Sequence, residues 1–310
     1  MASIRHLDIT HTVSSSKNID HSTPFSIHSI SKVFTEILTL LLIQEGIIQE
    51  EWLQQSLRIS DATKKLLPQA VLEQLEKTTT EQIMTHRGGF GDYAVDYFNE
   101  LAVKATNGET ITSIKKLNNF LIYADDTIVT LNNDETRYSN LGLLLLGLSI
   151  EHCYNTAMKH DKPLSFDEIL HKYIIEPAGM KIFSSQKPDN ACYNESGSCS
   201  QYICASPAGG HWTTAEDLQK FSIWLQEKYA TDIAFKQLLE KYGSEFYNFE
   251  TQEAHHSGGI GQQGIGEASA RFALFLRHEI SIVTLSNRPQ QAFTMYKTIY
   301  HNVLADQNNV

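Results

Sequence analysis

The chain has 310 residues, of which 41% are hydrophobic and 20% are charged, which is the composition of an ordinary globular protein. This length allows one large domain or two smaller ones. The formal net charge of −11 at pH 7 argues against a nucleic-acid partner. The apolar runs at residues 37–43 and 141–150 are far below the roughly 18 residues that cross a bilayer, so we expect no membrane span.

The amino terminus and the cysteines bear on the compartment. Residues 1–8 contain no apolar signal-peptide core. Cys192, Cys199 and Cys204 lie in one segment, but their spacing is not that of zinc ligands, and we expect neither a metal nor another cofactor. A disulfide such as Cys192 to Cys199 and free thiols are both open.

The first long helix is predicted from the spacing of its apolar residues. Apolar side chains recur from Ile30 to Leu42 on one helical face, and Gly46 marks the end of the pattern. A short extended segment at residues 24–27 precedes it, so Ser29 is expected at a corner between strand and helix. Before this corner, residues 4–13 are expected to supply one strand.

Helical patterns dominate the middle of the chain, at residues 50–57, 66–76, 92–105, 141–158 and 166–173. A further helix is expected to begin at a capping box formed by Thr213 and Glu216. Strands are predicted at residues 245–249, 271–277 and 280–285, and a helix at 293–304. We therefore predict an α/β (α+β) fold, in which residues 1–50 and 205–310 form an antiparallel sheet flanked by terminal helices, with a mostly helical insert at 51–204.

The predicted corner carries an S-x-x-K motif, Ser29-Ile30-Ser31-Lys32. A serine hydroxyl becomes a good nucleophile when a neighbour takes its proton, and a lysine one helical turn away can do so. The chain contains three other such motifs, but only this one lies in the first turn of a strongly amphipathic helix. The alternative is an N-capping serine beside a solvated lysine.

The motif Tyr138-Ser139-Asn140 lies just before the helix predicted at 141–158. In an extended segment, residues two apart point to the same side, so Tyr138 and Asn140 can face one cleft. A phenol can carry a proton and an amide can orient a substrate carbonyl. The alternative is a loop tyrosine and an N-capping asparagine.

A third motif, His256-Ser257-Gly258, precedes the predicted hairpin and is expected at a sheet edge. Such an edge offers N–H donors to a substrate oxygen, and glycine permits a close approach.

In this order, the three motifs resemble the S-x-x-K, Y-x-N and K-T-G or H-x-G motifs of the penicillin-recognising serine hydrolases. Segments 25–35, 84–88, 137–142, 176–180 and 207–218 are similar to successive blocks of the class C β-lactamase and D,D-peptidase branch. The resemblance covers about residues 24–290 and implies a β-lactamase/transpeptidase-like fold.

The resemblance implies a role for each motif. Ser29 would form an acyl-enzyme, and Lys32 and Tyr138 would share the proton transfers. The substrate would be bound by an amide side chain and the third motif, namely Asn140, His256, Ser257 and Gly258. The backbone N–H groups of Ser29 and Gly259 would form the oxyanion hole.

The implied function is a serine hydrolase that cleaves an amide or ester bond in a small molecule or peptide. Histidine at 256 favours a D,D-carboxypeptidase or esterase over a true β-lactamase, because histidine is a weaker fixed positive charge than lysine at pH 7. A non-catalytic descendant that binds a peptide or protein in the cleft is the alternative, because only 28 residues precede Ser29 and the family usually has more strands there. Peptidoglycan-related substrates and the cysteines favour a periplasmic or secreted protein, and the missing signal favours the cytoplasm.

Overall fold

The computed structural model describes residues 1–6, 9–13, 19–92, 117–124, 126–132, 135–159, 161–192, 205–259, 268–276, 279–288 and 290–307. The expected helix at 92–105 falls almost entirely outside these ranges, as do Cys199 and Cys204, so the disulfide and the free thiols both stay open. Within the described ranges, no helix has the length and apolar character needed to cross a membrane.

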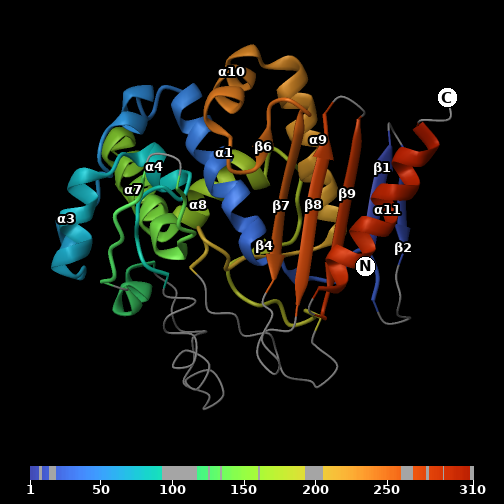
Figure 1. Ribbon diagram of the computed structural model, residues 1–310, viewed down its shortest axis with the longest axis horizontal. Helices are drawn as coiled ribbons and strands as arrows, with labels where there is room; N and C mark the ends of the chain where they lie inside the picture. The colour runs from blue at the N-terminus through green and yellow to red at the C-terminus, as the bar shows by residue number, and fades with distance from the viewer. Residues whose placement is uncertain are drawn as a thin grey trace.

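A six-stranded sheet in the order β2-β1-β9-β8-β7-β6 forms one layer of the protein (Figure 1). All neighbouring strands are antiparallel. The strands are β1 (Ala2–His6), β2 (Ile9–Val13), β6 (Tyr247–Asn248), β7 (Glu253–Gly259), β8 (Ser269–Phe275) and β9 (Ile280–Ser286). The amino-terminal strands thus extend a sheet whose other members come from the end of the chain.

The expectation of one strand at residues 4–13 is wrong, because the structure has two. Ile4 of β1 pairs with His11 of β2 on one side and with Ile282 of β9 on the other. Two strands of five residues each fit into the first thirteen residues because a hairpin needs only a short connection.

Helices cover both faces of the sheet (Figure 1). Because strand side chains alternate, Ala273 and Phe275 pack with Tyr296 and Tyr300 of α11 (Gln291–Gln307) on one face. The neighbouring Phe272 points to the other face, into the core that contains α1 (Ser31–Gln44) and α9 (Ala215–Thr231). The sheet and the terminal helix therefore match the predicted fold class.

Most of the remaining helices lie beside the sheet, beyond α1, whereas α10 (Ile233–Tyr242) packs against both α1 and α9 (Figure 1). The helices beside the sheet are η2 (Glu50–Gln54), α2 (Asp61–Lys64), α3 (Gln69–Lys77), α4 (Thr80–Met84), η4 (Leu117–Tyr123), α7 (Asn140–Met158), α8 (Phe166–Leu170) and the π-helix η5 (His171–Ile175). A small sheet in the order β3-β5-β4 joins the two parts, from β3 (Phe25–Ser26), β4 (Phe183–Ser184) and β5 (Trp212–Thr213).

Several element boundaries differ from the sequence predictions. The side chain that caps α9 is Thr214, which accepts from the N–H of Asp217, so the predicted capping box of Thr213 and Glu216 is wrong and the cap lies one residue later. The strand expected at 245–249 shortens to β6. The division into a sheet domain and an insert remains a prediction.

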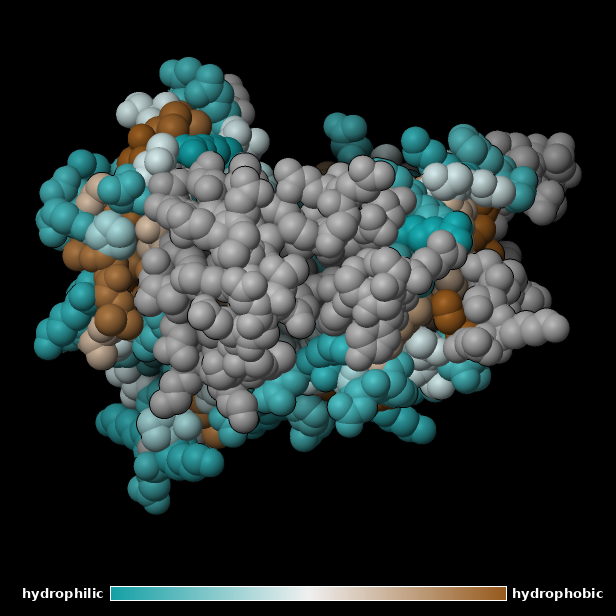
Figure 2. All heavy atoms as spheres, turned by 90° about the horizontal axis from the view of Figure 1, so that it is seen from below, coloured by the Kyte–Doolittle hydropathy of each residue, from teal (hydrophilic) through white to brown (hydrophobic). Residues whose placement is uncertain are grey.

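The surface seen from below is mostly hydrophilic where its residues are described, and apolar side chains gather at the end formed by the helices (Figure 2). This agrees with the acidic composition of the chain.

Candidate active site

Ser29 lies in a sharp corner between β3 and α1. The 3-10 turn η1 (His28–Ile30) forms this corner, and His28 within it has a φ of 47°, a left-handed conformation that is uncommon for a residue other than glycine. The N–H of Ile27 donates to the carbonyl oxygen of His211 at 3.0 Å, which ties the corner to β5. The N-cap of α1 is Ile30, so the capping alternative for Ser29 is wrong.

Three polar side chains meet at this corner. Ser29 Oγ lies 2.6 Å from the phenolic oxygen of Tyr138, and Lys32 Nζ lies 3.3 Å from Ser29 Oγ. Lys32 Nζ also lies 4.7 Å from the centre of the Tyr138 ring. The structure thus brings together the serine, the lysine and the tyrosine that the first two motifs predicted.

Lys32 is fully buried, at 0% exposure, and two carbonyl oxygens hold it. Its Nζ donates to Asn140 Oδ1 at 2.7 Å and to the backbone oxygen of Ala208. Because these oxygens can only accept, both contacts use N–H groups of Lys32. Besides its bond to the side chain, Nζ has three positions, and two of them carry the N–H groups used in these contacts. The third faces Ser29 and carries an N–H in the ammonium form or a lone pair in the neutral amine. Ala208 was missed by the sequence reasoning, because a backbone acceptor leaves no mark on residue type.

Asn140 connects Lys32 to a buried carboxylate. Its Nδ2 donates to the two carboxylate oxygens of Asp92 at 2.9 and 3.0 Å, which turns its Oδ1 toward Lys32. Ser139, not Asn140, caps α7, because its Oγ accepts from the N–H of Gly142 at 3.0 Å. The N-capping alternative for Asn140 is therefore wrong. Asp92 was also missed, since no short-range pattern links it to Asn140.

His86 packs beside Tyr138, with ring centres 4.4 Å apart. Its Nδ1 accepts from the N–H of Ser139 at 3.2 Å, and its Nε2 lies 3.7 Å from Glu245 Oε1. Burial, with the positive charge of Lys32 as a second cause, lowers the pKa of His86 to about 3. His86 is therefore a neutral imidazole at pH 7, with its proton assigned to Nε2.

The end of β7 packs against the corner. A Cβ placed on Gly258 would lie 2.2 Å from the carbonyl oxygen of Ile27 and 3.0 Å from the nitrogen of Ser29. Glycine is therefore needed for this close approach. Gly259 follows at the exposed end of the strand, opposite Ser269. This arrangement places the backbone of Gly259 at the edge of the sheet next to the corner that carries Ser29.

His256 lies on the same face of β7 as Gly258, because residues two apart on a strand share a face. Burial, then the charge of Lys32, lowers its pKa to about 3, so it is neutral at pH 7. Its Nε2 has no hydrogen-bond partner among the described residues. Ser257 points the other way, where its Oγ accepts from Arg271, so the structure separates Ser257 from the other predicted residues.

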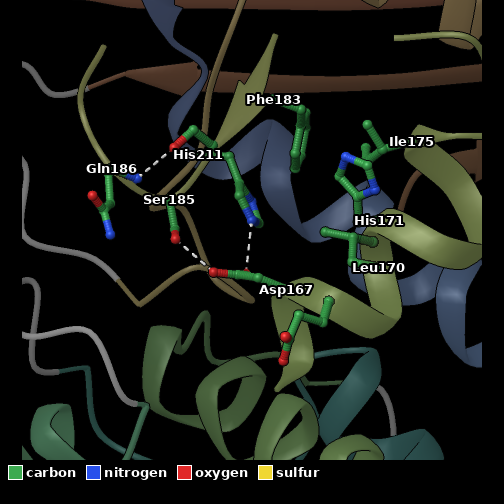
Figure 3. A pocket seen from close by; sticks show the side chains of 10 residues that line it. Asp167, Leu170, His171, Ile175, Phe183, Ser185, Gln186 and His211 are labelled. Carbon is green, nitrogen blue, oxygen red and sulfur yellow. Dashed lines mark hydrogen bonds and ion pairs between the residues drawn. The ribbon is translucent and has the colours of Figure 1, made fainter. Parts of the chain in front are cut away.

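A separate pocket of about 260 Å³ is lined by α8, η5, β4 and His211 (Figure 3). His211 Nε2 lies 3.3 Å from Asp167 Oδ1, and Ser185 Oγ donates to Asp167 Oδ2 at 2.5 Å. No lysine is among its lining residues, and Ser185 donates to a carboxylate that already faces an imidazole. These contacts join α8 to the residue that precedes β5, and β5 pairs with β3 ahead of Ser29.

The described residues contain no cluster of three His, Cys, Asp or Glu side chains placed to hold a metal ion. The polar side chains that meet at the corner are the serine hydroxyl, the lysine amine and the phenol.

Solved structures share this fold over nearly the whole chain. A penicillin-binding protein from Bacillus halodurans is 18% identical with a TM-score of 0.68, over 97% of this chain and 94% of that one. A D-stereospecific amidohydrolase from Streptomyces sp. is 18% identical with a TM-score of 0.67, over 93% and 88%. A class C β-lactamase from Rhodobacter sphaeroides is 12% identical with a TM-score of 0.63, over 97% and 94%.

Sequence comparison leads to the same group. "Beta-lactamase-like protein 4" of Dictyostelium discoideum is 28% identical over 237 residues, which are 72% of this chain. The chain spans only 38% of that protein's length. The Beta-lactamase family model matches residues 9–306. The chain therefore belongs to the β-lactamase family, whose fold is that of serine hydrolases.

Proposed function

We propose that this protein is a serine hydrolase that cleaves an amide or ester bond through an acyl-enzyme on Ser29. The observation that carries the proposal is the position of Ser29 Oγ, 2.6 Å from the Tyr138 oxygen and 3.3 Å from Lys32 Nζ. Both distances are within reach of a proton transfer from the hydroxyl, which a serine needs to attack a carbonyl.

Lys32 is suited to the role of base by its two fixed contacts. As a neutral amine it has two N–H groups for Asn140 Oδ1 and the Ala208 oxygen, and its lone pair is then directed at the Ser29 hydroxyl. Ser29 Oγ forms a bond to the substrate carbonyl carbon while its proton passes to Lys32, directly or by way of Tyr138. The carbonyl oxygen becomes an oxyanion, which the N–H groups of Ser29 and Gly259 would stabilise.

Collapse of this intermediate breaks the bond to the leaving amine or alcohol, which takes a proton from Tyr138, and the proton held by Lys32 passes to Tyr138 and restores the phenol and the neutral amine. The phenol is the better donor at this step because it is 42% exposed and faces the substrate side, whereas Lys32 is enclosed. Water then attacks the acyl-enzyme, loses its proton along the same path, and releases the acid and Ser29.

The proposed substrates are D-amino-acid peptides or amides and small esters. Within this class the neutral state of His256 supports amides and esters most directly, because His256 provides no fixed positive charge for a substrate carboxylate at pH 7. The Streptomyces protein with the same fold is described as a D-stereospecific amidohydrolase, which is the same class of chemistry.

The proposal is tested by turnover of a panel that contains a chromogenic short-chain ester, a D-amino-acid amide, a D-Ala-D-Ala peptide and a cephalosporin. We expect turnover of the ester and the D-amino-acid amide, abolished by Ser29→Ala. Ser184→Ala is the matched control, because Ser184 belongs to another S-x-x-K sequence, with Lys187, and should leave turnover unchanged. Preferential cleavage of the cephalosporin would instead identify a β-lactamase, and no turnover of any substrate would favour the non-catalytic binding protein.

A further inference from the structure

Glu36 is a buried carboxyl one helical turn after Lys32 on α1. It is 1% exposed, and neither of its carboxyl oxygens has a hydrogen-bond partner among the described residues. Burying an unpartnered carboxyl is unfavourable, and far more so when it is ionised. Its presence at this position therefore calls for a role that an apolar residue could not fill.

The position of Glu36 couples it to Lys32. Residues four apart on a helix lie on the same face, so both side chains leave α1 on one side. Glu245, in the segment between α10 and β6, adds a second carboxyl to this group. Burial raises the pKa of Glu36 well above its ordinary value, the charge of Glu245 raises it further, and the charge of Lys32 opposes both.

Of the other titratable groups around Lys32, three histidines are neutral at pH 7, and two carboxyl groups face other side chains. Burial, with Lys32 as the second cause, lowers the pKa of His28 to about 4. His86 and His256 are neutral at pH 7 for the same reasons. Burial raises the pKa of Glu245, Lys32 opposes the shift, and Glu245 Oε1 lies 3.7 Å from His86 Nε2.

Asp92 completes the set, and both its oxygens accept from Asn140. Glu36 differs from Asp92 in that neither of its carboxyl oxygens has a hydrogen-bond partner among the described residues, and from Glu245, whose side chain is 23% exposed, in being almost fully buried. It is therefore the carboxyl of this group that neither a hydrogen bond from a described residue nor solvent stabilises.

We propose that Glu36 is a positioning residue of the Ser29 site that acts through Lys32, an inference that rests on the proposed function. While Glu36 holds its proton, Lys32 can adopt the neutral amine form whose lone pair accepts the proton of Ser29. When Glu36 loses its proton, the new negative charge favours the ammonium form, which has three N–H groups and no lone pair. Glu36 thereby limits the pH range over which Ser29 reacts.

The test is the rate at which a fluorophosphonate labels Ser29 between pH 5 and 10. In Glu36→Gln, a neutral side chain of nearly the same shape, the rising limb of the profile should move to lower pH by about one unit, because a permanent neutral group replaces one that can ionise. Glu45→Gln is the matched control, since Glu45 is exposed at the end of the same helix. Its profile should coincide with that of the wild type.

If the buried amide of the Glu36→Gln variant prevents folding, Glu36→Leu is the second variant to measure, because a leucine side chain needs no hydrogen-bond partner. A folded Glu36→Leu protein with the same shift supports the role, and a profile that coincides with the wild type in either variant overturns it. A merely structural role would change the rate at all pH values without moving the limb. If the wild type is not labelled at any pH, both the proposed function and the role of Glu36 fail. If the wild type is labelled but the variants show no shift of the profile, only the role of Glu36 is contradicted.

Discussion

Gly258 and Ile27 are in such close contact that a Cβ on Gly258 would lie 2.2 Å from the carbonyl oxygen of Ile27. This contact joins the end of β7, which extends beyond its short pairing with β6, to the corner that carries Ser29. It explains why the third motif ends in glycine, because only a residue without a side chain lets the two backbones meet.

Gly258→Ala should therefore push β7 away from the corner. We expect a loss of about 1–3 kcal/mol in the free energy of unfolding, the usual cost of overpacking, and a fall in turnover. Urea unfolding and ester hydrolysis measure the two effects. Gly142→Ala is the matched control, since its Cβ would make only ordinary contacts, the nearest at 3.4 Å. Full turnover in Gly258→Ala would contradict this role of the contact.

Tyr138→Phe removes the phenolic oxygen that lies 2.6 Å from Ser29 Oγ. Turnover should fall by about 10²-fold or more, the usual effect of losing a proton-transfer group, while thermal stability is retained because Tyr138 is exposed. Tyr300→Phe is the control, because Tyr300 starts another Y-x-N sequence and lies on α11 against Phe275. Equal turnover in wild type and Tyr138→Phe would exclude the tyrosine from the proton path.

Asn140→Ala removes the acceptor of one Lys32 N–H and the donor to Asp92 at once. Because both partners are buried, we expect a loss of about 2–4 kcal/mol in the free energy of unfolding, measured by denaturant titration. Turnover should also fall, since Lys32 is no longer oriented toward Ser29. Asn155→Ala on the same helix is the control, because Asn155 donates hydrogen bonds to the backbone oxygens of Glu151 and Leu164, which lie outside the site. This variant should lose stability, but its folded protein should keep its turnover.

The neutral histidines predict how stability depends on pH. The pKa values of His86 and His256 are lowered to about 3, so the unfolded chain binds more protons than the folded one between about pH 6.5 and pH 3. The free energy of unfolding should therefore fall as the pH is lowered through this range. His256→Gln should make the dependence less steep, as measured by denaturant titrations at several pH values. An unchanged slope would show that His256 is not kept neutral by the fold.

The elements with strong periodic patterns were predictable from the sequence. The apolar face from Ile30 to Leu42 and the run at 141–158 correspond to α1 and α7, because their burial dictates the spacing of apolar residues. The hairpin of β8 and β9 was equally visible. By contrast, the second amino-terminal strand and the displaced cap at Thr214 depend on pairing and local geometry that periodicity does not specify.

The candidate site divides in the same way. Ser29, Lys32 and Tyr138 belong to motifs whose residue types match a chemical task, and the structure places them together. Ala208, Asp92 and Glu36 left no such signal, since a backbone oxygen and buried carboxyls acquire meaning only through contacts between distant segments or through burial. Motif spacing also failed to predict that Ser257 turns away toward Arg271.

The central claim is that Ser29 is the nucleophile, and the most direct measurement is peptide mapping by mass spectrometry after reaction with a fluorophosphonate. The account predicts a single adduct on the peptide that contains Ser29, absent from Ser29→Ala and retained in Ser184→Ala. An adduct on another residue, or equal labelling of wild type and Ser29→Ala, would contradict it.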